Sequence, residues 1–151
     1  MKIVFDMDGT IADLYAVPDW LSKIENSNPT PYLEAKPMWD MRKLAHTCQI
    51  CRTLGIKIHI VTWLSPDSTK EYERLTAIAK LAWLKKYGFP YDFFHPITYG
   101  ISKSAVIKPL LAKNETAILF DDNAKVREDW KIGRTVDPTT CDIIKVLESL
   151  I

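Results

Sequence analysis

The chain has 151 residues, of which 47% are hydrophobic and 26% are charged, a globular composition that excludes a disordered or fibrous protein. Its formal net charge of +1 gives no reason to expect nucleic acid or an anionic membrane as an obligate partner. No apolar run approaches the length of a membrane span, and the first apolar strand begins at Ile3. We therefore expect a cytoplasmic protein without a signal peptide, in which residues 1–151 form one domain.

The first strand runs from Ile3 to Phe5 and leads into Asp6-Met7-Asp8-Gly9-Thr10. Side chains alternate along a strand, but a bend at its carboxyl end lets Asp6 and Asp8 converge on one point. Two carboxylates so close together require a cation, and hard oxygen ligands favour Mg²⁺, which keeps open positions for water or a phosphate.

Residues 14–40 form an insertion whose Trp20, Leu21 and Ile24 have helical spacing, although its prolines exclude one continuous helix. Because it follows the carboxylate turn directly, it is either a flap over the carboxyl end of the sheet or a connection packed on the domain. Its aromatic residues Trp20, Tyr32 and Trp39 either stack on a substrate base or serve packing. Residues 11–40 contain five acids and two lysines, which disfavours a long polyanion as substrate.

A helix is predicted from Pro37 or Met38 to Leu54, closed by Gly55. Within it, His46, Cys48 and Cys51 allow a zinc or redox interpretation, but the two cysteines continue an apolar helix face that starts at Met41. No fourth ligand is spaced to complete a zinc site, so the pattern favours core packing. The odd total of three cysteines indicates a reducing compartment.

The second strand is predicted over Ile56–Val61 and ends in Thr62-Trp63, with Ser65 capping a long helix that runs to Tyr87. A hydroxyl at a strand end, followed by backbone amides that lead into a helix, suits phosphate oxygens. A third strand over Phe93–Thr98 leads to Lys103 near a helix start, where a lysine opposes the helix dipole unless an anion is near. Lys108 is the competing candidate for a site lysine, but Pro109 follows it directly.

A fourth strand over Thr116–Phe120 ends in Asp121 and Asp122, an adjacent pair that a cation can compensate. Asp122 is also a candidate N-cap for a helix over residues 124–130. A fifth strand is predicted from Gly133 to Val136, followed by a last helix capped by Thr139 or Thr140. Strands that alternate with helices predict an α/β fold with a doubly wound, mostly parallel, five-stranded Rossmann-like sheet.

In chain order, Asp6/Asp8, Thr62, Lys103 and Asp121/Asp122 resemble the four motifs of the haloacid dehalogenase (HAD) superfamily. The resemblance spans nearly the whole chain, with a short flap at about residues 14–40 instead of a full cap domain. The Ala12-Asp13 pair and the Leu119–Asp122 ending are faintly similar to the 5'-nucleotidase branch.

The resemblance implies that Asp6 attacks phosphorus to form an aspartyl-phosphate and that Asp8 is the general acid and base. It further implies that Asp6, the Asp8 backbone carbonyl, Asp121 and Asp122 hold Mg²⁺. Phosphate oxygens are then expected to be bound by residues of the first three motifs: Gly9, Thr10, Thr62, Trp63 and Lys103. The branches of the superfamily that cleave carbon–halogen bonds lack the second Asp, so Asp8 indicates phosphate chemistry.

The leading hypothesis is a Mg²⁺-dependent phosphomonoesterase that acts on a small or nucleotide-like phosphate ester. The alternatives are a phosphate-binding or interaction module without turnover and a phosphatase that acts on nucleic-acid ends. A minimal cap leaves the site open, so closure by a second copy of the chain is a further possibility.

Overall fold

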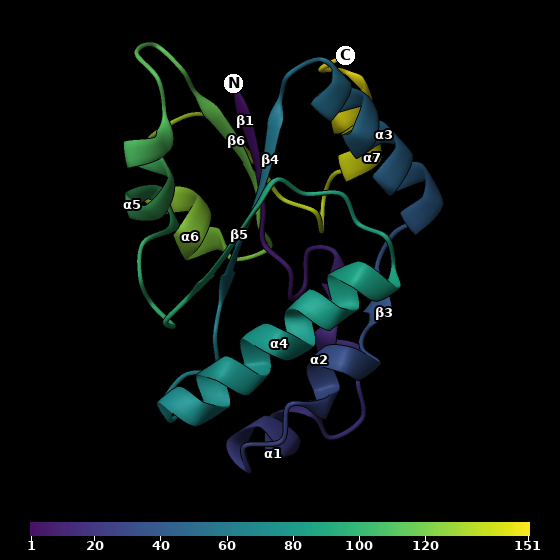
Figure 1. Ribbon diagram of the computed structural model, residues 1–151, viewed down its shortest axis with the longest axis vertical. Helices are drawn as coiled ribbons and strands as arrows, with labels where there is room; N and C mark the ends of the chain where they lie inside the picture. The colour runs from purple at the N-terminus through teal and green to yellow at the C-terminus, as the bar shows by residue number, and fades with distance from the viewer.

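A computed structural model describes all 151 residues and contains a five-stranded parallel sheet with the strand order β5-β4-β1-β6-β7. The strands are β1 (Lys2–Phe5), β4 (Lys57–Trp63), β5 (Phe93–Ile97), β6 (Ala117–Phe120) and β7 (Thr135–Val136) (Figure 1). Helices cover both faces of the sheet, which confirms the doubly wound α/β, Rossmann-like fold predicted from the sequence. None of the helices combines the length and the apolar character that a bilayer crossing requires.

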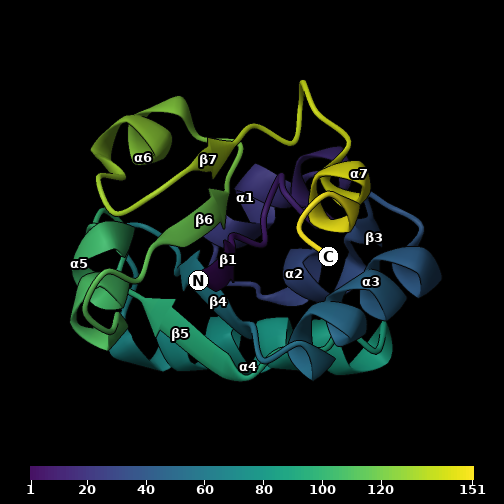
Figure 2. The same cartoon turned by 90° about the horizontal axis from the view of Figure 1, so that it is seen from above.

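Alternation along the central strands divides the core into two layers. Ile3 and Phe5 of β1 pack with α3 (Met41–Thr53) and α7 (Ile143–Glu148), whereas Val4 packs on the opposite face. That second face is covered by α5 (Lys103–Ile107) and α6 (Ala124–Asp129), and Figure 2 shows the two helix pairs on opposite sides of the sheet. Within α3, Cys48 and Cys51 are fully buried while His46 is exposed, as the core-packing interpretation predicted.

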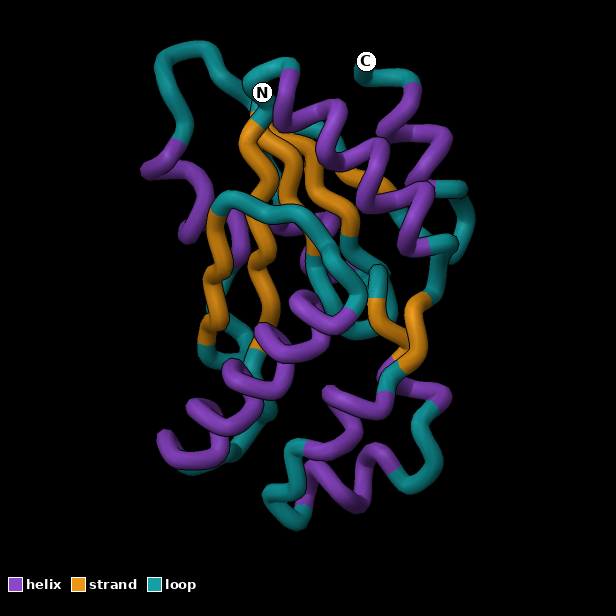
Figure 3. The backbone as a smooth tube through the Cα atoms, turned by 45° about the vertical axis from the view of Figure 1, so that its right-hand side comes forward, coloured by secondary structure: helices purple, strands orange, loops and turns teal.

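Residues 14–40 leave and rejoin the domain through a two-stranded antiparallel sheet of β2 (Ala12–Asp13) and β3 (Lys36–Pro37). Between these strands lie the short 3₁₀ helix η1 (Leu14–Ala16), α1 (Trp20–Glu25) and α2 (Thr30–Glu34). Helix α2 packs on the long helix α4 (Lys70–Lys86), at the end of the molecule opposite both termini (Figure 3). This end is where the parallel strands terminate, so the insertion lies beside their carboxyl ends.

Several predicted helix starts were wrong by a few residues, because tertiary contacts compete with local capping. Helix α4 begins at Lys70 with Thr69 as its N-cap, not at Ser65, whose hydroxyl instead forms a 2.6 Å hydrogen bond with Tyr32 of the insertion. Asp67, with φ of 51°, interrupts the chain before the helix.

Three other caps also differ from the prediction. Helix α3 starts at Met41 behind Asp40, because Lys36–Pro37 belong to β3, and Asn123 rather than Asp122 caps α6. Helix α7 is capped by Asp142, since the turn at residues 137–140 is organised by the Asp137 carboxylate, which binds Thr139.

A histidine pair connects β4 to the edge strand β5. The Nδ1 atom of His59 lies 3.0 Å from Nε2 of His95, and His59 Nε2 is buried without a partner. A proton on His59 Nε2 would be an unsatisfied buried donor, so we assign the proton to Nδ1, which donates to His95. Burial, followed by the proximity of His95, lowers the pKa of His59 to about 4.

This histidine predicts a loss of stability in mild acid. In the unfolded state His59 is protonated near its ordinary pKa of about 6.5, whereas in the folded state it is protonated only near pH 4. The unfolding free energy should therefore fall between these pH values relative to a His59→Phe variant, by at most about 1.4 kcal/mol per pH unit. Urea unfolding of both proteins across this range measures the difference. If both proteins lost stability equally as the pH falls, the lowered pKa of His59 would be contradicted.

Candidate active site

The carboxyl ends of β1, β4 and β6 border a cavity of about 450 Å³. Six of the predicted site residues line it: Asp6, Asp8, Trp63, Lys103, Asp121 and Asp122. Asp6 follows β1 and Asp121 follows β6, two strands that pair in parallel with Phe5 opposite Phe120. The sheet register therefore places two carboxylates from distant parts of the sequence side by side.

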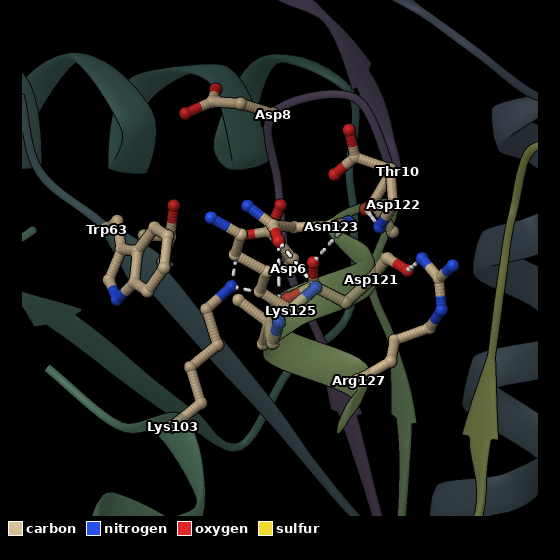
Figure 4. Close-up of polar contacts among 12 residues, drawn as sticks. Asp6, Asp8, Thr10, Trp63, Lys103, Asp121, Asp122, Asn123, Lys125 and Arg127 are labelled. Carbon is tan, nitrogen blue, oxygen red and sulfur yellow. Dashed lines mark hydrogen bonds and ion pairs between the residues drawn. The ribbon is translucent and has the colours of Figure 1, made fainter. Parts of the chain in front are cut away.

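Lys103 joins these two carboxylates. Its Nζ donates to Asp6 Oδ1 at 2.6 Å and to Asp121 Oδ2 at 2.7 Å, and its side chain is almost fully buried (Figure 4). Burial alone would lower the pKa of Lys103, but the carboxylates of Asp6 and Asp121 outweigh it and raise that pKa. Lys108, the competing lysine, is exposed.

A cluster of three carboxylates, from Asp6, Asp121 and Asp122, has the composition of a hard-cation site. One oxygen from each lies within 4.8 Å of the others, and two of the three residues are buried. Burial and then the Asp6 charge raise the pKa of Asp121 to about 6 and that of Asp122 to about 7. The single positive charge of Lys103 does not offset the mutual repulsion of the three carboxylates, so the cluster can accommodate a further cation. Three carboxylate oxygens are a donor set that fits Mg²⁺.

Asp8 lies apart from this cluster and has a lysine of its own. Figure 4 shows its carboxylate turned away from Asp6. Asp8 Oδ2 accepts a 2.6 Å hydrogen bond from Lys80 Nζ, and burial raises the pKa of Asp8 against the opposing charge of Lys80. The two carboxylates of the first motif therefore occupy different electrostatic environments.

Lys80 was not among the residues predicted from the sequence. It lies on the buried face of α4, which also includes Thr76, Ala79, Trp83 and Leu84. A lysine flanked by apolar residues at helical spacing is the one signal that would have indicated a buried charge.

Three of the residues expected to bind phosphate do not line the cavity. Thr62 is fully buried and its hydroxyl oxygen accepts from Lys80, while the Thr10 hydroxyl oxygen accepts a 3.2 Å hydrogen bond from the backbone N–H of Asp122. Gly9 has φ of 77°, and a Cβ there would overlap the Asp122 carboxylate and the Tyr15 ring. In this arrangement they support the acidic residues rather than face the cavity.

Arg127 is a further supporting residue that the sequence did not indicate. Its guanidinium donates to the backbone carbonyl of Asp121 at 2.8 Å and to the Asp137 carboxylate at 2.7 Å. It thereby ties the loop after β6 to the loop after β7 and fixes the backbone that carries the acidic pair.

The insertion supplies one wall of the cavity. The insertion residues that line it are Tyr15, Trp20, Leu21, Ile24 and Tyr32, and two further aromatic residues, Trp63 and Tyr99, line it from the ends of β4 and β5. Trp39, the third aromatic residue considered from the sequence, packs elsewhere and donates its Nε1–H to the Thr10 carbonyl at 2.7 Å.

Comparisons with known proteins give structural neighbours only. No family model and no curated protein matches the sequence. The fold resembles a chain in the structure of the Pnkp1/Rnl/Hen1 RNA repair complex, with a TM-score of 0.60, 14% identity, and coverage of 90% of this chain and 41% of that one. A chain in a second structure of the Pnkp1/Rnl/Hen1 complex matches with a TM-score of 0.56 and 17% identity, over 90% of this chain and 45% of that one. This chain thus spans less than half of either neighbour, and at such identity the likeness shows the fold alone.

The acidic cluster predicts that Mg²⁺ stabilises the protein. Asp122→Asn removes one ligand and one repelling charge, so it should raise the melting temperature without metal and weaken Mg²⁺ binding about tenfold or more. Asp67→Asn, in the same cavity but outside the cluster, is the matched control. Calorimetric titration and thermal melting with and without Mg²⁺ measure both effects. Equal Mg²⁺ affinity in Asp122→Asn and the wild type would contradict the site.

Proposed function

We propose that the protein is a Mg²⁺-dependent phosphomonoesterase that acts through an aspartyl-phosphate on Asp6. The observation that carries this proposal is the buried Lys103, which holds Asp6 and Asp121 beneath a cavity large enough for a small ester. A fixed cation next to a carboxylate neutralises charge that would otherwise repel an anionic phosphate. The order of the motif-like residues along the chain supports the same chemistry.

In the proposed reaction, an Asp6 oxygen attacks phosphorus, and the bond between phosphorus and the leaving oxygen breaks. Asp8 gives its proton to the leaving oxygen and then takes one from the water that attacks the aspartyl-phosphate, which releases phosphate and restores Asp6. Lys103 stabilises the charge on the equatorial phosphate oxygens. Mg²⁺ held by Asp6, Asp121, Asp122 and the Asp8 carbonyl would supply Lewis-acid charge neutralisation at the phosphate.

The lining of the cavity supports a small ester whose leaving group carries a flat ring, such as a nucleotide, which would release a nucleoside. Aromatic side chains come from the insertion and from the β4 and β5 ends, and stacking on such rings contributes about 1–3 kcal/mol per base. We propose that the insertion is a substrate-contacting flap, since Tyr15, Trp20 and Tyr32 belong to it. The cavity has six acidic side chains and one basic one, which disfavours additional phosphates.

A phosphatase acting on nucleic-acid ends is the second candidate, because both structural neighbours come from complexes that contain Pnkp1, Rnl and Hen1, one of them described as an RNA repair complex. The acidic lining argues against it, since strand binding depends on lysines and arginines that neutralise phosphates. Turnover of end-phosphorylated oligonucleotides that exceeds turnover of mononucleotides, with a steep salt dependence, would favour this candidate.

The nucleophile assignment predicts the behaviour of simple variants. The wild type should release phosphate from an aryl phosphate with Mg²⁺ and stop in EDTA, and Asp6→Asn should be inactive because an amide does not attack phosphorus. Asp8→Asn should lose about 10²–10⁴-fold with an alkyl phosphate, the usual contribution of a general acid and base. Phosphate release assays measure each; metal-independent turnover would contradict the mechanism.

The aromatic wall predicts a preference for esters that carry a base. A nucleoside monophosphate should have a lower KM than ribose 5-phosphate, and Trp20→Leu should remove much of that difference. Phe93→Leu, an exposed aromatic residue outside the cavity, is the control. Steady-state kinetics with both substrates test this. If the ratio of KM for ribose 5-phosphate to KM for the nucleoside monophosphate were the same in Trp20→Leu and the wild type, Trp20 would not be the residue that contacts the base.

A further inference from the structure

The ammonium group of Lys80 lies where the first motif, the end of β4 and α4 meet. Its Nζ donates to Asp8 Oδ2 at 2.6 Å, to Thr62 Oγ1 at 2.7 Å and to the Trp63 carbonyl at 2.8 Å. A lysine ammonium has three N–H donors, so all three are used. The hydrogen bonds to Thr62 and Trp63 fix the ammonium group at the end of β4, so the third N–H points toward Asp8.

The surroundings keep this group in place. The Lys80 side chain is 1% exposed, and Asp8 is the carboxylate with which it forms an ion pair. The Tyr32 ring of the insertion lies 4.9 Å from Nζ, and the Tyr32 hydroxyl is bonded to Ser65 just beyond β4. A buried charge with a single counter-ion holds that partner strongly, because separating the two would leave both unpaired.

We propose that Lys80 is the positioning residue for Asp8 and determines which of its two oxygens carries the proton in catalysis. This inference rests on the proposed phosphatase function. An ammonium only donates hydrogen bonds, and the unprotonated oxygen of a carboxyl group accepts them more strongly than its hydroxyl oxygen does, so the bond from Lys80 to Oδ2 favours the proton on Oδ1. The transferable proton therefore resides on Oδ1.

This arrangement serves both halves of the reaction without rotation of Asp8. In the first step the Oδ1–H bond breaks and its proton goes to the leaving oxygen. In the second step Oδ1 takes a proton from the attacking water. Oδ2 remains bonded to Lys80 throughout, so the geometry of Asp8 is set before the substrate arrives, as preorganised catalysis requires.

A comparison of leaving groups tests this role. A phenolate such as p-nitrophenolate leaves with little help from an acid, whereas an alkoxide needs a proton. Lys80→Met should lower kcat/KM, which reports the first displacement and not the hydrolysis of the aspartyl-phosphate, about 10²-fold for an alkyl phosphate and less than about tenfold for p-nitrophenyl phosphate. Lys80→Gln, which keeps an N–H donor toward Oδ2, should lose less than Lys80→Met. Lys85→Met, an exposed position on the same helix, should match the wild type.

A double-mutant cycle separates positioning from general damage to the fold. Once Asp8 is replaced by Asn, adding Lys80→Met should not lower kcat/KM for the alkyl ester further, because Lys80 acts through Asp8. Equal losses of kcat/KM for both leaving groups, a further loss in the double variant, or wild-type kinetics in both Lys80 variants would overturn the inference while the proposed function stands. A wild type without Mg²⁺-dependent turnover of either ester would overturn both.

Discussion

The site depends on two buried lysines, each paired with one carboxylate of the turn after β1. Lys103 binds Asp6, and Lys80 binds Asp8, at 2.6 Å in both cases. Burying an ammonium is costly unless a carboxylate and further acceptors surround it, and both lysines have such partners. Because the lysines come from different helices, α5 and α4, the two carboxylates are drawn apart and are free to take different roles.

The fold and the acidic part of the site could be predicted from the sequence, because they follow from local patterns. Apolar strands that end in Asp6 or Asp121 must meet at one edge of a parallel sheet. An anion near Lys103 was also predicted, because a lysine at a helix start opposes the helix dipole, and its Nζ contacts Asp6 and Asp121. In contrast, the apolar spacing around Lys80 indicates only that this lysine is buried. Its partner Asp8 depends on how α4 is placed against the sheet, which no local pattern specifies. Ser65 failed as a helix cap for the same reason: its partner, Tyr32, is distant in the sequence.

The insertion has a structural and a proposed functional role that are linked through α4. It packs on α4, its Tyr32 ring covers the Lys80 ammonium, and its Tyr15 and Trp20 line the cavity. A substrate held against this wall would therefore contact the same segment that shields the lysine behind Asp8. In this account, the flap supplies recognition and also shields the Lys80 ammonium from water. A full cap domain is not required for either task.

The central claim is that Asp6 attacks phosphorus directly, so that hydrolysis consists of two successive displacements. The stereochemical outcome with an isotopically chiral thiophosphate ester tests this most directly. Two in-line displacements predict retention of configuration at phosphorus. Inversion would mean that water attacks the ester in a single step, and it would contradict the role of Asp6 as nucleophile.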